Sequence, residues 1–372
     1  MNNKKLPSQA IIFGSVGVNR GDDLMNRVLH NACVRAGYEV SIASIDPTSY
    51  AAIYGGDVFS SSKSNMLNWF KRIYKADCVI IGGGTMIQND FGRTGFSGIL
   101  LYASSVLFMA AMLRVPRIYV IGIGINKISR KNWFFAQFFR FADVILVRDA
   151  ASVHNARMVG LSKYITASHD VGLAASLYDS GLKNDTLGTP LSHAERPYVC
   201  LSIAKEKSEI AAYGLAKKLV SASIGAGLDV RLLAMDIREE EELGIYRKLK
   251  DEFREAVTIV IPKNPFELVP MLRAARLCIG MRLHFCVLSV VAGQKVVVVS
   301  REQKTEWLAE FVGKERFIDF FSATAGDQVV KIIAENATVD NGLDQTAITK
   351  LKRIDAEITS KLQELLQRNE AL

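Results

Sequence analysis

The chain has 372 residues, of which 49% are hydrophobic and 23% are charged. This length exceeds what one ordinary core holds and predicts two domains, while the composition excludes a disordered chain. The net charge of +8 arises in the first half, because residues 1–180 hold 19 Lys and Arg against 11 Asp and Glu, whereas residues 181–372 hold 27 against 27.

A basic half favours an anionic partner, which could be a phosphorylated small molecule, an acidic glycan, an anionic membrane surface or nucleic acid. A solvated surface with a high isoelectric point would explain the same excess. No cluster of Lys and Arg with interleaved aromatic residues stands out in the sequence. We therefore expect no nucleic-acid partner.

The cysteines and the apolar runs indicate the cellular location of the protein. Five cysteines, an odd number without a CxxC pair, lie in or beside apolar runs, which is typical of reduced thiols in a cytoplasmic protein. The five histidines show no metal-ligand spacing. The N-terminus lacks the features of a secretory signal. Residues 98–113 are uncharged but short for a membrane span, so we predict a buried helix there.

Short apolar runs alternate with helical patterns along the first half of the chain. Strands are predicted at residues 9–18, 38–46, 76–84, 117–125, 143–149 and 164–170. Helices are predicted between them at residues 21–37, 98–113, 133–142 and 150–160. Nearly continuous apolar strands separated by helices predict a parallel sheet covered on both faces.

Residues 171–197 interrupt this alternation with Gly, Asp, Asn, Ser and Pro, a composition typical of a linker. The alternation then resumes, with predicted strands at residues 197–206, 228–236, 256–262, 275–280 and 294–300. The acidic run 239–242 is expected to open a helix, where carboxylates suit the positive end of the dipole. Residues 344–368 are predicted to form one long helix.

These elements predict an α/β protein with two Rossmann-like parallel-sheet domains. We assign residues 1–175 to a basic N-terminal domain, 176–197 to a linker, 198–340 to a C-terminal domain and 341–372 to a C-terminal helix. Ligands of open parallel sheets bind at the carboxyl ends of the strands. We therefore expect the functional residues to follow strands and to face a cleft between the domains.

Several motifs stand at predicted strand ends. Gly82-Gly83-Gly84-Thr85 could bring backbone amides and a helix N-terminus to an anion, or could be a tight strand-to-helix turn. In Asn19-Arg20-Gly21-Asp22-Asp23, Asp22 is either a helix cap or part of a functional loop. Arg148-Asp149 could be an internal ion pair, and Asp170 a cap or a base beside His169.

The segment Met281-Arg282-Leu283-His284 begins a long apolar run. An unpaired buried charge is costly, so Arg282 and His284 require a partner or an exposed position. If a helix begins near Gly280 or Met281, both side chains lie in its first turn and need not be buried. Free amides, a guanidinium and an imidazole there predict a site for an anion and a proton.

Taken in their order along the chain, these motifs resemble those of the polysaccharide pyruvyl transferase family. The resemblance runs from about residue 10 to 315 and is carried by Asn19-x-Gly21-Asp22-Asp23, Gly82-Gly83-Gly84 with Gln88-Asn89-Asp90, Arg148-Asp149-x-x-Ser152, Asp170, and Gly280-Met281-Arg282-Leu283-His284 with Lys304 downstream. It implies a glycosyltransferase-B-like pair of domains and transfer of pyruvate from phosphoenolpyruvate to a sugar of a surface polysaccharide or its lipid-linked precursor, as a cyclic ketal.

The resemblance and the required chemistry assign roles to residues. Proton transfer is expected from His284, with Asp170 or Asp22 as its partner or as an acceptor ligand. Donor and acceptor binding is expected at Arg282, Leu283, Arg148, Lys304, Asn19, Gly21, Asp22, Gly83 and Gly84. We expect no cofactor and no metal, because this reaction scheme requires no metal and the sequence shows no metal motif.

Three functions stay open at this point. The first is the pyruvyl transferase, with phosphoenolpyruvate and a glycan or lipid-linked oligosaccharide as partners. The second is a sugar-nucleotide glycosyltransferase of the same architecture, and the third is a non-catalytic glycan-binding protein. A lipid-linked acceptor would suit a cytoplasmic protein that contacts the inner face of the membrane.

Overall fold

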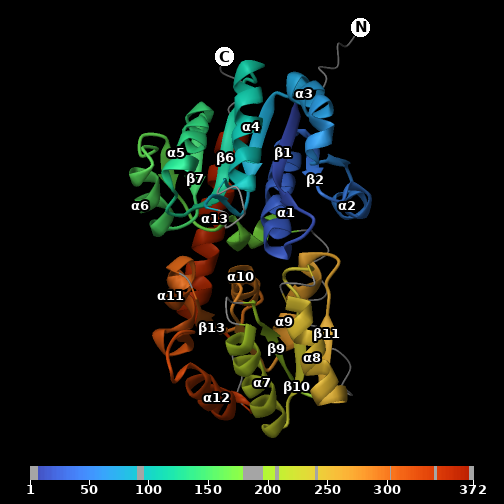
Figure 1. Cartoon of the computed structure of the whole chain (residues 1–372), viewed down its shortest axis with the longest axis vertical. Coiled ribbons are helices and arrows are strands. Elements are labelled where there is room, and N and C mark those ends of the chain that lie inside the picture. Colours follow the sequence, from blue (N-terminus) through green and yellow to red (C-terminus); the bar gives the residue numbers. More distant parts are fainter. Residues whose placement is uncertain are drawn as a thin grey trace. The chain divides into compact units, whose positions relative to one another are not determined.

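The computed structural model describes residues 7–89, 96–178, 196–205, 209–238, 242–301, 303–338 and 342–367, without the side chains of residues 52–53 and 303–304. The chain forms two compact units, each built on its own sheet (Figure 1). The first unit contains residues 1–17, 22–178 and 354–372. The second contains residues 18–21 and 179–353.

The first unit holds an eight-stranded sheet in the order β3-β2-β1-β4-β6-β7-β8, with β5 beside β6. Every pair of neighbouring strands is parallel. The strands are β1 Gln9–Val16, β2 Glu39–Ser44, β3 Asp57–Ser60, β4 Cys78–Gly82, β5 Thr85–Ile87, β6 Ile118–Ile125, β7 Val144–Val147 and β8 Ile165–Ala167. The central strands β4 and β6 are buried along their whole length, which explains their continuous apolar sequences.

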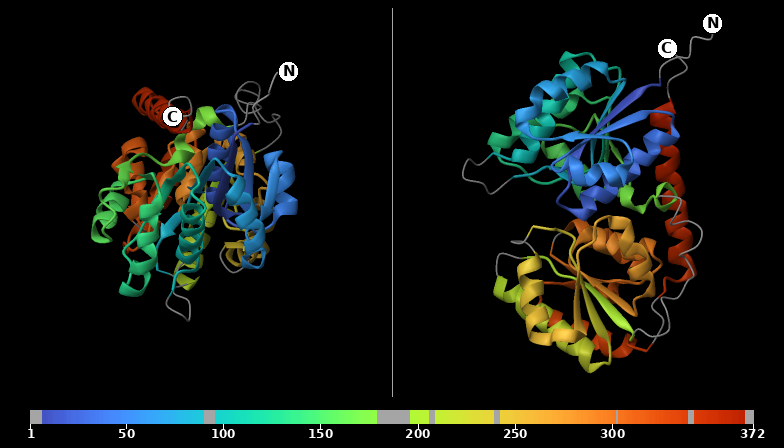
Figure 2. Two further views of the ribbon diagram at one scale, coloured as in Figure 1. Left: turned by 90° about the horizontal axis from the view of Figure 1, so that it is seen from above. Right: turned by 90° about the vertical axis from the view of Figure 1, so that its right-hand side faces the viewer.

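Helices of the first unit pack against its sheet (Figure 2). They are α1 Arg20–Arg35, α2 Pro47–Tyr54, α3 Met66–Lys75, α4 Gly98–Met112, α5 Arg130–Ala136 and α6 Ala150–Met158, with the 3-10 helices η2 Gln137–Phe141 and η3 Val171–Leu173. Ser97 caps α4 by accepting a hydrogen bond from the Leu100 amide, at 3.3 Å. The sheet and helices α3, α4, α5 and η2 share one apolar core that includes Trp69, Leu107 and Phe139.

The second unit holds a six-stranded parallel sheet in the order β11-β10-β9-β12-β13-β14. Its strands are β9 Tyr198–Ser202, β10 Asp229–Leu233, β11 Val257–Val260, β12 Leu277–Gly280, β13 Val297–Ser300 and β14 Phe317–Asp319. Its helices are α7 Glu209–Gly225, α8 Gly244–Phe253, α9 Leu268–Ala274, α10 Leu283–Val291, α11 Ala309–Val312 and α12 Ala325–Asn336, with the 3-10 helix η9 Gln303–Leu308.

The last helix, α13, runs from Gln345 to Gln367 and belongs to the first unit from Ile354 onward. Tyr119 in β6 donates a hydrogen bond to the Leu365 carbonyl, at 3.0 Å. Asp355 accepts one from the Ser176 hydroxyl, at 2.7 Å. The end of the chain is therefore part of the first unit's structure.

The prediction of two parallel α/β domains is confirmed. One local prediction was wrong: the glycine triplet leads into strand β5 and not into a helix. Thr85 and Ile87 pair with the last residues of β6, Gly124 and Ile125, which draws the chain back into the sheet. A cleft between the domains stays a prediction.

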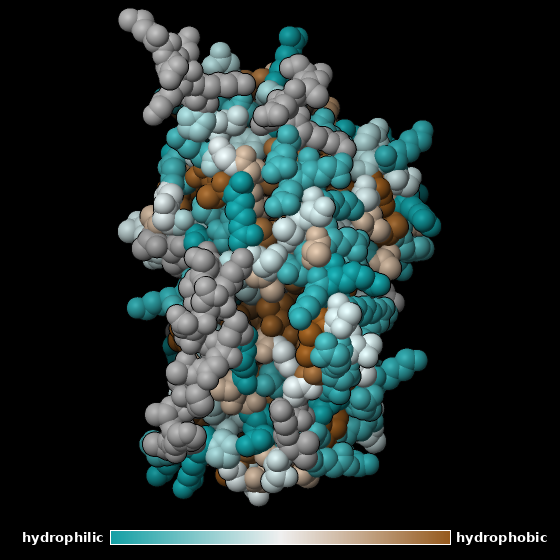
Figure 3. All heavy atoms as spheres, turned by 180° about the vertical axis from the view of Figure 1, so that it is seen from behind, coloured by the Kyte–Doolittle hydropathy of each residue, from teal (hydrophilic) through white to brown (hydrophobic). Residues whose placement is uncertain are grey.

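The five cysteines are buried and form no disulfide. Within the part of the chain that the structure describes, no helix is both long enough and apolar enough to cross a membrane. Charged and polar residues cover most of the face shown in Figure 3, and hydrophobic residues occupy smaller areas of it.

Candidate functional site

The second sheet has its switch point between β9 and β12. From β9 the chain proceeds to β10 on one side, and β12 pairs with β9 on the other. The Met281 amide donates to the Ser202 carbonyl, at 2.8 Å, so the two strands end side by side. Diverging connections at such a point leave room for a ligand. The chain leaves β12 through Arg282 into α10.

Arg282 is the N-cap residue of α10, with an extended backbone. The helix therefore begins at Leu283, two or three residues later than the sequence suggested. Leu283 and His284 lie in its first turn and are buried, and His284 is 8% exposed. We expected Arg282 and His284 to escape burial; the structure instead buries His284 and supplies Arg282 with partners.

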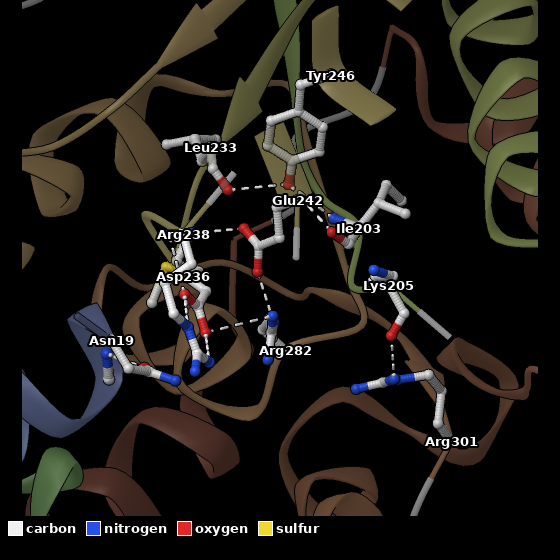
Figure 4. Close-up of polar contacts among 12 residues, drawn as sticks. Asn19, Ile203, Lys205, Leu233, Asp236, Arg238, Glu242, Tyr246, Arg282 and Arg301 are labelled. Atoms are coloured by element: carbon white, nitrogen blue, oxygen red, sulfur yellow. Dashed lines mark hydrogen bonds and ion pairs between the residues drawn. The ribbon is translucent and has the colours of Figure 1, made fainter. Parts of the chain in front are cut away.

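The partners of Arg282 are two carboxylates with no exposed surface (Figure 4). Its Nε lies 2.5 Å from Oε1 of Glu242, and its Nη2 lies 3.9 Å from Oδ2 of Asp236. Asp236 also holds Arg238, whose Nη2 lies 2.5 Å from the same oxygen. Two guanidinium groups and two carboxylates thus form one ion-pair network at the end of β10.

Burial and charge act in opposite directions on Glu242. Removal from water raises its pKa to about 7, although the neighbouring Arg282 and the amide of Met235, which donates to Oε2 at 2.8 Å, favour the ionised form. The pKa of Arg282 rises because the two carboxylates outweigh its own burial. The carboxyl group of Glu242 therefore changes between its protonated and ionised forms near neutral pH, while Arg282 stays charged.

Tyr246 fixes the strand ends beside this network. Its hydroxyl accepts a hydrogen bond from the Ile203 amide, at 3.0 Å, and donates to the Leu233 carbonyl, at 3.1 Å (Figure 4). Burial raises the pKa of Tyr246 well above its usual value, so the hydroxyl keeps its proton. The ends of β9 and β10 are thereby held at a set separation.

Residues 18–21 complete the second unit's site. The Arg20 amide donates to the Met235 carbonyl, at 2.8 Å, and the Ile237 amide donates to the Val18 carbonyl, at 3.1 Å. Asn19 thereby pairs with Asp236 in an antiparallel bridge. The side chain of Arg20, 5% exposed, donates from Nε to the Pro262 carbonyl, at 2.8 Å.

Gly21 lies against the ring of His284. A Cβ atom at position 21 would come within 2.0 Å of Nδ1 and 2.4 Å of Cγ of that ring, closer than any real contact. Glycine is required here by this close approach. The structure thus brings together five of the predicted residues in the second unit: Asn19, Gly21, Arg282, Leu283 and His284.

A second group of predicted residues lies at the strand ends of the first unit. Gly83 and Gly84 have positive φ angles of 63° and 75°, which glycine adopts without strain. A Cβ on Gly84 would lie 3.1 Å from Oδ1 of Asp22, and one on Gly83 would lie 3.1 Å from Cβ of Met25. The triplet is thus a tight turn packed on α1, which supports the structural interpretation of these glycines.

Arg148 follows β7 and is almost completely buried, with 5% exposed. Its Nη2 donates to the Thr85 hydroxyl, at 3.1 Å, and its Nε lies 3.4 Å from Oδ2 of Asp149. Asp149 in turn caps α6 by accepting from the Ser152 amide, at 2.6 Å. Arg148 is therefore part of an internal ion pair that also fixes the turn after Gly84.

The other predicted residues have different surroundings. Asp170 is 1% exposed and caps η3 by accepting from the Gly172 amide, at 2.9 Å. It belongs to the first unit, whereas His284 belongs to the second. Lys304 lies in η9, and its side chain is outside the described part of the chain, as is Asp90.

The sequence analysis missed Asp236, Arg238 and Glu242. Asp236 ends a predicted strand, which was a usable signal. Glu242 belongs to the run 239–242, which we expected to open a helix; residues 239–241 lie outside the described part. Within the described residues, no group of three or more His, Cys, Asp or Glu side chains could hold a metal ion.

Comparisons with known proteins identify a family and a fold. A family model described as polysaccharide pyruvyl transferase matches residues 19–303. No curated protein matches the sequence. Among solved structures, UDP-GlcNAc 2-epimerase from Neisseria meningitidis bound to UDP-GlcNAc has a TM-score of 0.62 at 8% identity, covering 96% of this chain and all (100%) of that chain. Anabaena HepE in complex with UDP-glucose has a TM-score of 0.58 at 12% identity, covering 95% and 99%. The chain shares the glycosyltransferase-B-like fold with these proteins.

Proposed function

Because the chain belongs to the polysaccharide pyruvyl transferase family, we propose that it transfers pyruvate from phosphoenolpyruvate to two hydroxyl groups of one sugar, forming a cyclic ketal. The observation that carries this proposal is the start of α10, where Arg282, the first-turn amides and the buried His284 occupy the sheet's switch point.

The proposed reaction requires two proton transfers. Protonation of the methylene carbon of phosphoenolpyruvate and attack of one sugar hydroxyl on C2 give a tetrahedral intermediate that still carries phosphate. Phosphate then leaves, and the second hydroxyl adds to C2 to close the ketal. One hydroxyl proton is gained by the new methyl group in the overall balance, and the other leaves with inorganic phosphate. We assign proton transfer to His284.

The donor is a polyanion, and the proposed site offers matching charge. The first-turn amides of α10 and the Arg282 guanidinium suit its carboxylate or phosphate. Glu242 and Asp236 hold Arg282 in one orientation. Since Glu242 titrates near neutral pH, we propose that binding of the anionic donor favours the protonated form of Glu242. The positive charge of Arg282 is then no longer balanced by the Glu242 carboxylate and can pair with the donor.

The roles of the first-unit residues follow the same proposal. Asp22, Gly83 and Gly84 are assigned to the acceptor side, together with the turn that Arg148 stabilises. We assign Lys304 to donor binding. Asp170, which caps η3 through one carboxylate oxygen, stays our proposed partner of His284 in proton transfer. We propose that the reaction takes place in the cytoplasm, in line with five buried thiols, and that it needs no cofactor.

The decisive experiment measures phosphate release from phosphoenolpyruvate with a panel of glycoside and lipid-linked acceptors. We expect acceptor-dependent release that His284→Ala lowers at least a hundredfold. Arg301→Ala is a matched control, because this cationic side chain also follows a strand of the second sheet and donates to the Lys205 carbonyl, at 3.0 Å (Figure 4).

Binding of the donor, measured by calorimetry, separates the alternatives. Binding of phosphoenolpyruvate would support the proposal even before the acceptor is identified. Binding of a UDP-sugar without binding of phosphoenolpyruvate would instead favour a sugar-nucleotide enzyme such as a glycosyltransferase; the Neisseria and Anabaena structures hold UDP-GlcNAc and UDP-glucose. Binding of glycan alone would indicate a non-catalytic protein.

A further inference from the structure

Helices α3, α4, α5 and η2 cover one face of the first sheet, and hydrophobic side chains lie exposed on their outer side. On α4, α5 and η2 these are Phe108, Met112, Trp133, Phe134 and Phe141, which are between 44% and 67% exposed. We call these five residues the aromatic surface. On α3, Leu67 and Tyr74 are 81% and 71% exposed. These residues are not part of the apolar core beneath the helices, so their hydrophobicity is not explained by folding.

Ring contacts connect members of the aromatic surface from all three elements, α4, α5 and η2. The half-buried Phe138 of η2 links three of the five residues, because its ring centroid lies 5.7 Å from that of Phe108 in α4, 5.7 Å from that of Phe134 in α5 and 5.9 Å from that of Phe141. All three pairs are edge-to-face. Scattered apolar residues are normal on protein surfaces, whereas a connected group of this kind marks an interaction site.

The sequence of α4 supports this interpretation. Its fifteen residues include no charged side chain. The positions on its outer side, Leu101, Ser105, Phe108 and Met112, follow helical spacing, yet none is ionised. A helix on the surface of a globular protein ordinarily carries charged or polar residues on that side. The outer side of α4 therefore has the composition of a face that becomes covered.

The charges around the aromatic surface are mostly positive. Residues 58–142 contain eleven Lys and Arg against two Asp and no Glu. Helices α3, α4, α5 and η2 contain no acidic residue. Exposed cationic side chains lie on or beside them at Lys71, Lys75, Arg114, Arg130, Lys131 and Arg140. Because these residues come from separate segments, the sequence alone did not show them as one cluster.

We propose that this face binds the surface of an anionic phospholipid bilayer. Trp and Phe side chains settle at the depth of lipid headgroups, and each nearby Lys or Arg adds attraction to anionic lipid. The described helices cannot span a membrane, so binding is peripheral. Nucleic acid fits less well, because the phenylalanines pack edge-to-face on one another, and Leu67 and Met112 offer no ring for base stacking.

The test is vesicle flotation with the full chain. We expect the protein to float with vesicles of phosphatidylcholine and phosphatidylglycerol in a 3:1 ratio and not with phosphatidylcholine alone. Salt at 0.5 M should lower binding at least fivefold. The double variant Phe108→Ser/Phe134→Ser should lower it at least tenfold, and Arg130→Gln/Lys131→Gln/Arg140→Gln should lower it to a similar extent.

The matched control is Ile210→Ser/Phe321→Ser in the second unit, whose side chains are 85% and 67% exposed; it should float like the wild type. Thermal melts establish that all variants are folded. Three results would overturn the proposal: no flotation of the wild type, unchanged flotation of the aromatic variant, or flotation lost equally in the control. The proposal would also be overturned if the protein did not bind vesicles and the aromatic substitutions instead dissociated a dimer or abolished oligonucleotide binding. The measurement uses neither donor nor acceptor, so it stands independently of the transferase assay.

Discussion

At the scale of single residues, the contact between Gly21 and His284 is the most restrictive feature of the candidate site. The first-turn position of His284 follows from the sequence pattern, because a strand followed by a polar pair and an apolar run predicts a helix start. The neighbour across the ring could not be predicted, since Gly21 and His284 are separated by more than 260 positions and no local pattern connects them.

We therefore predict that Gly21→Ala displaces the His284 ring. A Cβ at 2.0 Å from Nδ1 must move the ring or the segment 18–21, and misplacement of a catalytic group by about 1 Å can cost a hundredfold in rate. Phosphate release should fall by at least tenfold. Gly214→Ala in α7 is the control, because nothing lies within 4 Å of its added Cβ, and it should stabilise the fold by about 0.5–1 kcal/mol. Activity of Gly21→Ala within twofold of the wild type would contradict the prediction.

Arg282 shows a second limit of what can be predicted from the sequence. Its need for a partner follows from the cost of burying a charge, and the structure supplies Glu242 and Asp236. Their identity depends on long-range folding. The acidic run predicts a helix start near Glu242, but no local pattern predicts the burial of this side chain beside Arg282.

Glu242 gives stability a pH dependence of predictable sign. Its pKa is about 7 in the folded chain and near 4.5 when unfolded. Between these values the folded state keeps a proton that the unfolded state has lost, so the contribution of Glu242 to stability falls as pH rises through 7. The full effect is on the order of 3 kcal/mol. Urea unfolding from pH 4.5 to 8 should show this decline in the wild type and lose it in Glu242→Gln.

A suitable control for that titration is Glu252→Gln. The pKa of the exposed Glu252 is lowered, chiefly by its hydrogen bond with Lys217, so its contribution is present at neutral pH and disappears only in acid. This variant should keep the slope of the wild type between pH 5 and 7. Parallel curves for the wild type and Glu242→Gln would show that Glu242 is ionised throughout this range.

At the scale of secondary structure, long apolar strands were the most predictable elements. Strand β6 was expected at residues 117–125 and is observed at Ile118–Ile125, because a strand buried on both faces has an unbroken apolar sequence. Strand β5 was missed. Three residues are too few for a recognisable period, and its formation depends on the free edge that Gly124 and Ile125 of β6 offer.

The cap of α6 provides a test at the same scale. Asp149 accepts a hydrogen bond from the Ser152 amide, at 2.6 Å, and lies 3.4 Å from Arg148. Asp149→Ala removes both contacts and leaves Arg148 buried beside fewer acceptors, so it should destabilise the fold by about 1–3 kcal/mol. Asp149→Asn keeps the cap and should recover part of that loss. Chemical denaturation of the two variants measures the difference, and equal losses would show that the ion pair outweighs the cap.

At the scale of the whole molecule, two parallel-sheet domains follow from the alternation of strands and helices, but their membership does not follow from sequence position. Residues 18–21 belong to the second unit, and residues 354–372 belong to the first. Both assignments depend on hydrogen bonds between distant segments, such as Arg20 with Met235 and Tyr119 with Leu365.

Arg20 tests this membership directly. Arg20→Ala removes the buried hydrogen bond to the Pro262 carbonyl and should cost about 1–3 kcal/mol. Hydrogen exchange monitored by mass spectrometry should speed up in peptides from residues 228–237 and 257–264 of the second unit. Arg35→Ala, which loses a comparable but exposed bond to the Ser176 carbonyl, is the control. Faster exchange confined to the first sheet would contradict the assignment of residues 18–21.

The position of residues 18–21 also limits how such a chain can be recombined. A genetic crossover between two relatives at residues 179–195 separates the two sheets, yet it would pair the histidine of one parent with the glycine and asparagine of the other. A working chimera must inherit both stretches from the same parent. The first half of the gene therefore encodes residues 18–21 of the second unit, and the second half encodes residues 354–372 of the first unit. Substitutions in the two halves are expected to be correlated among relatives.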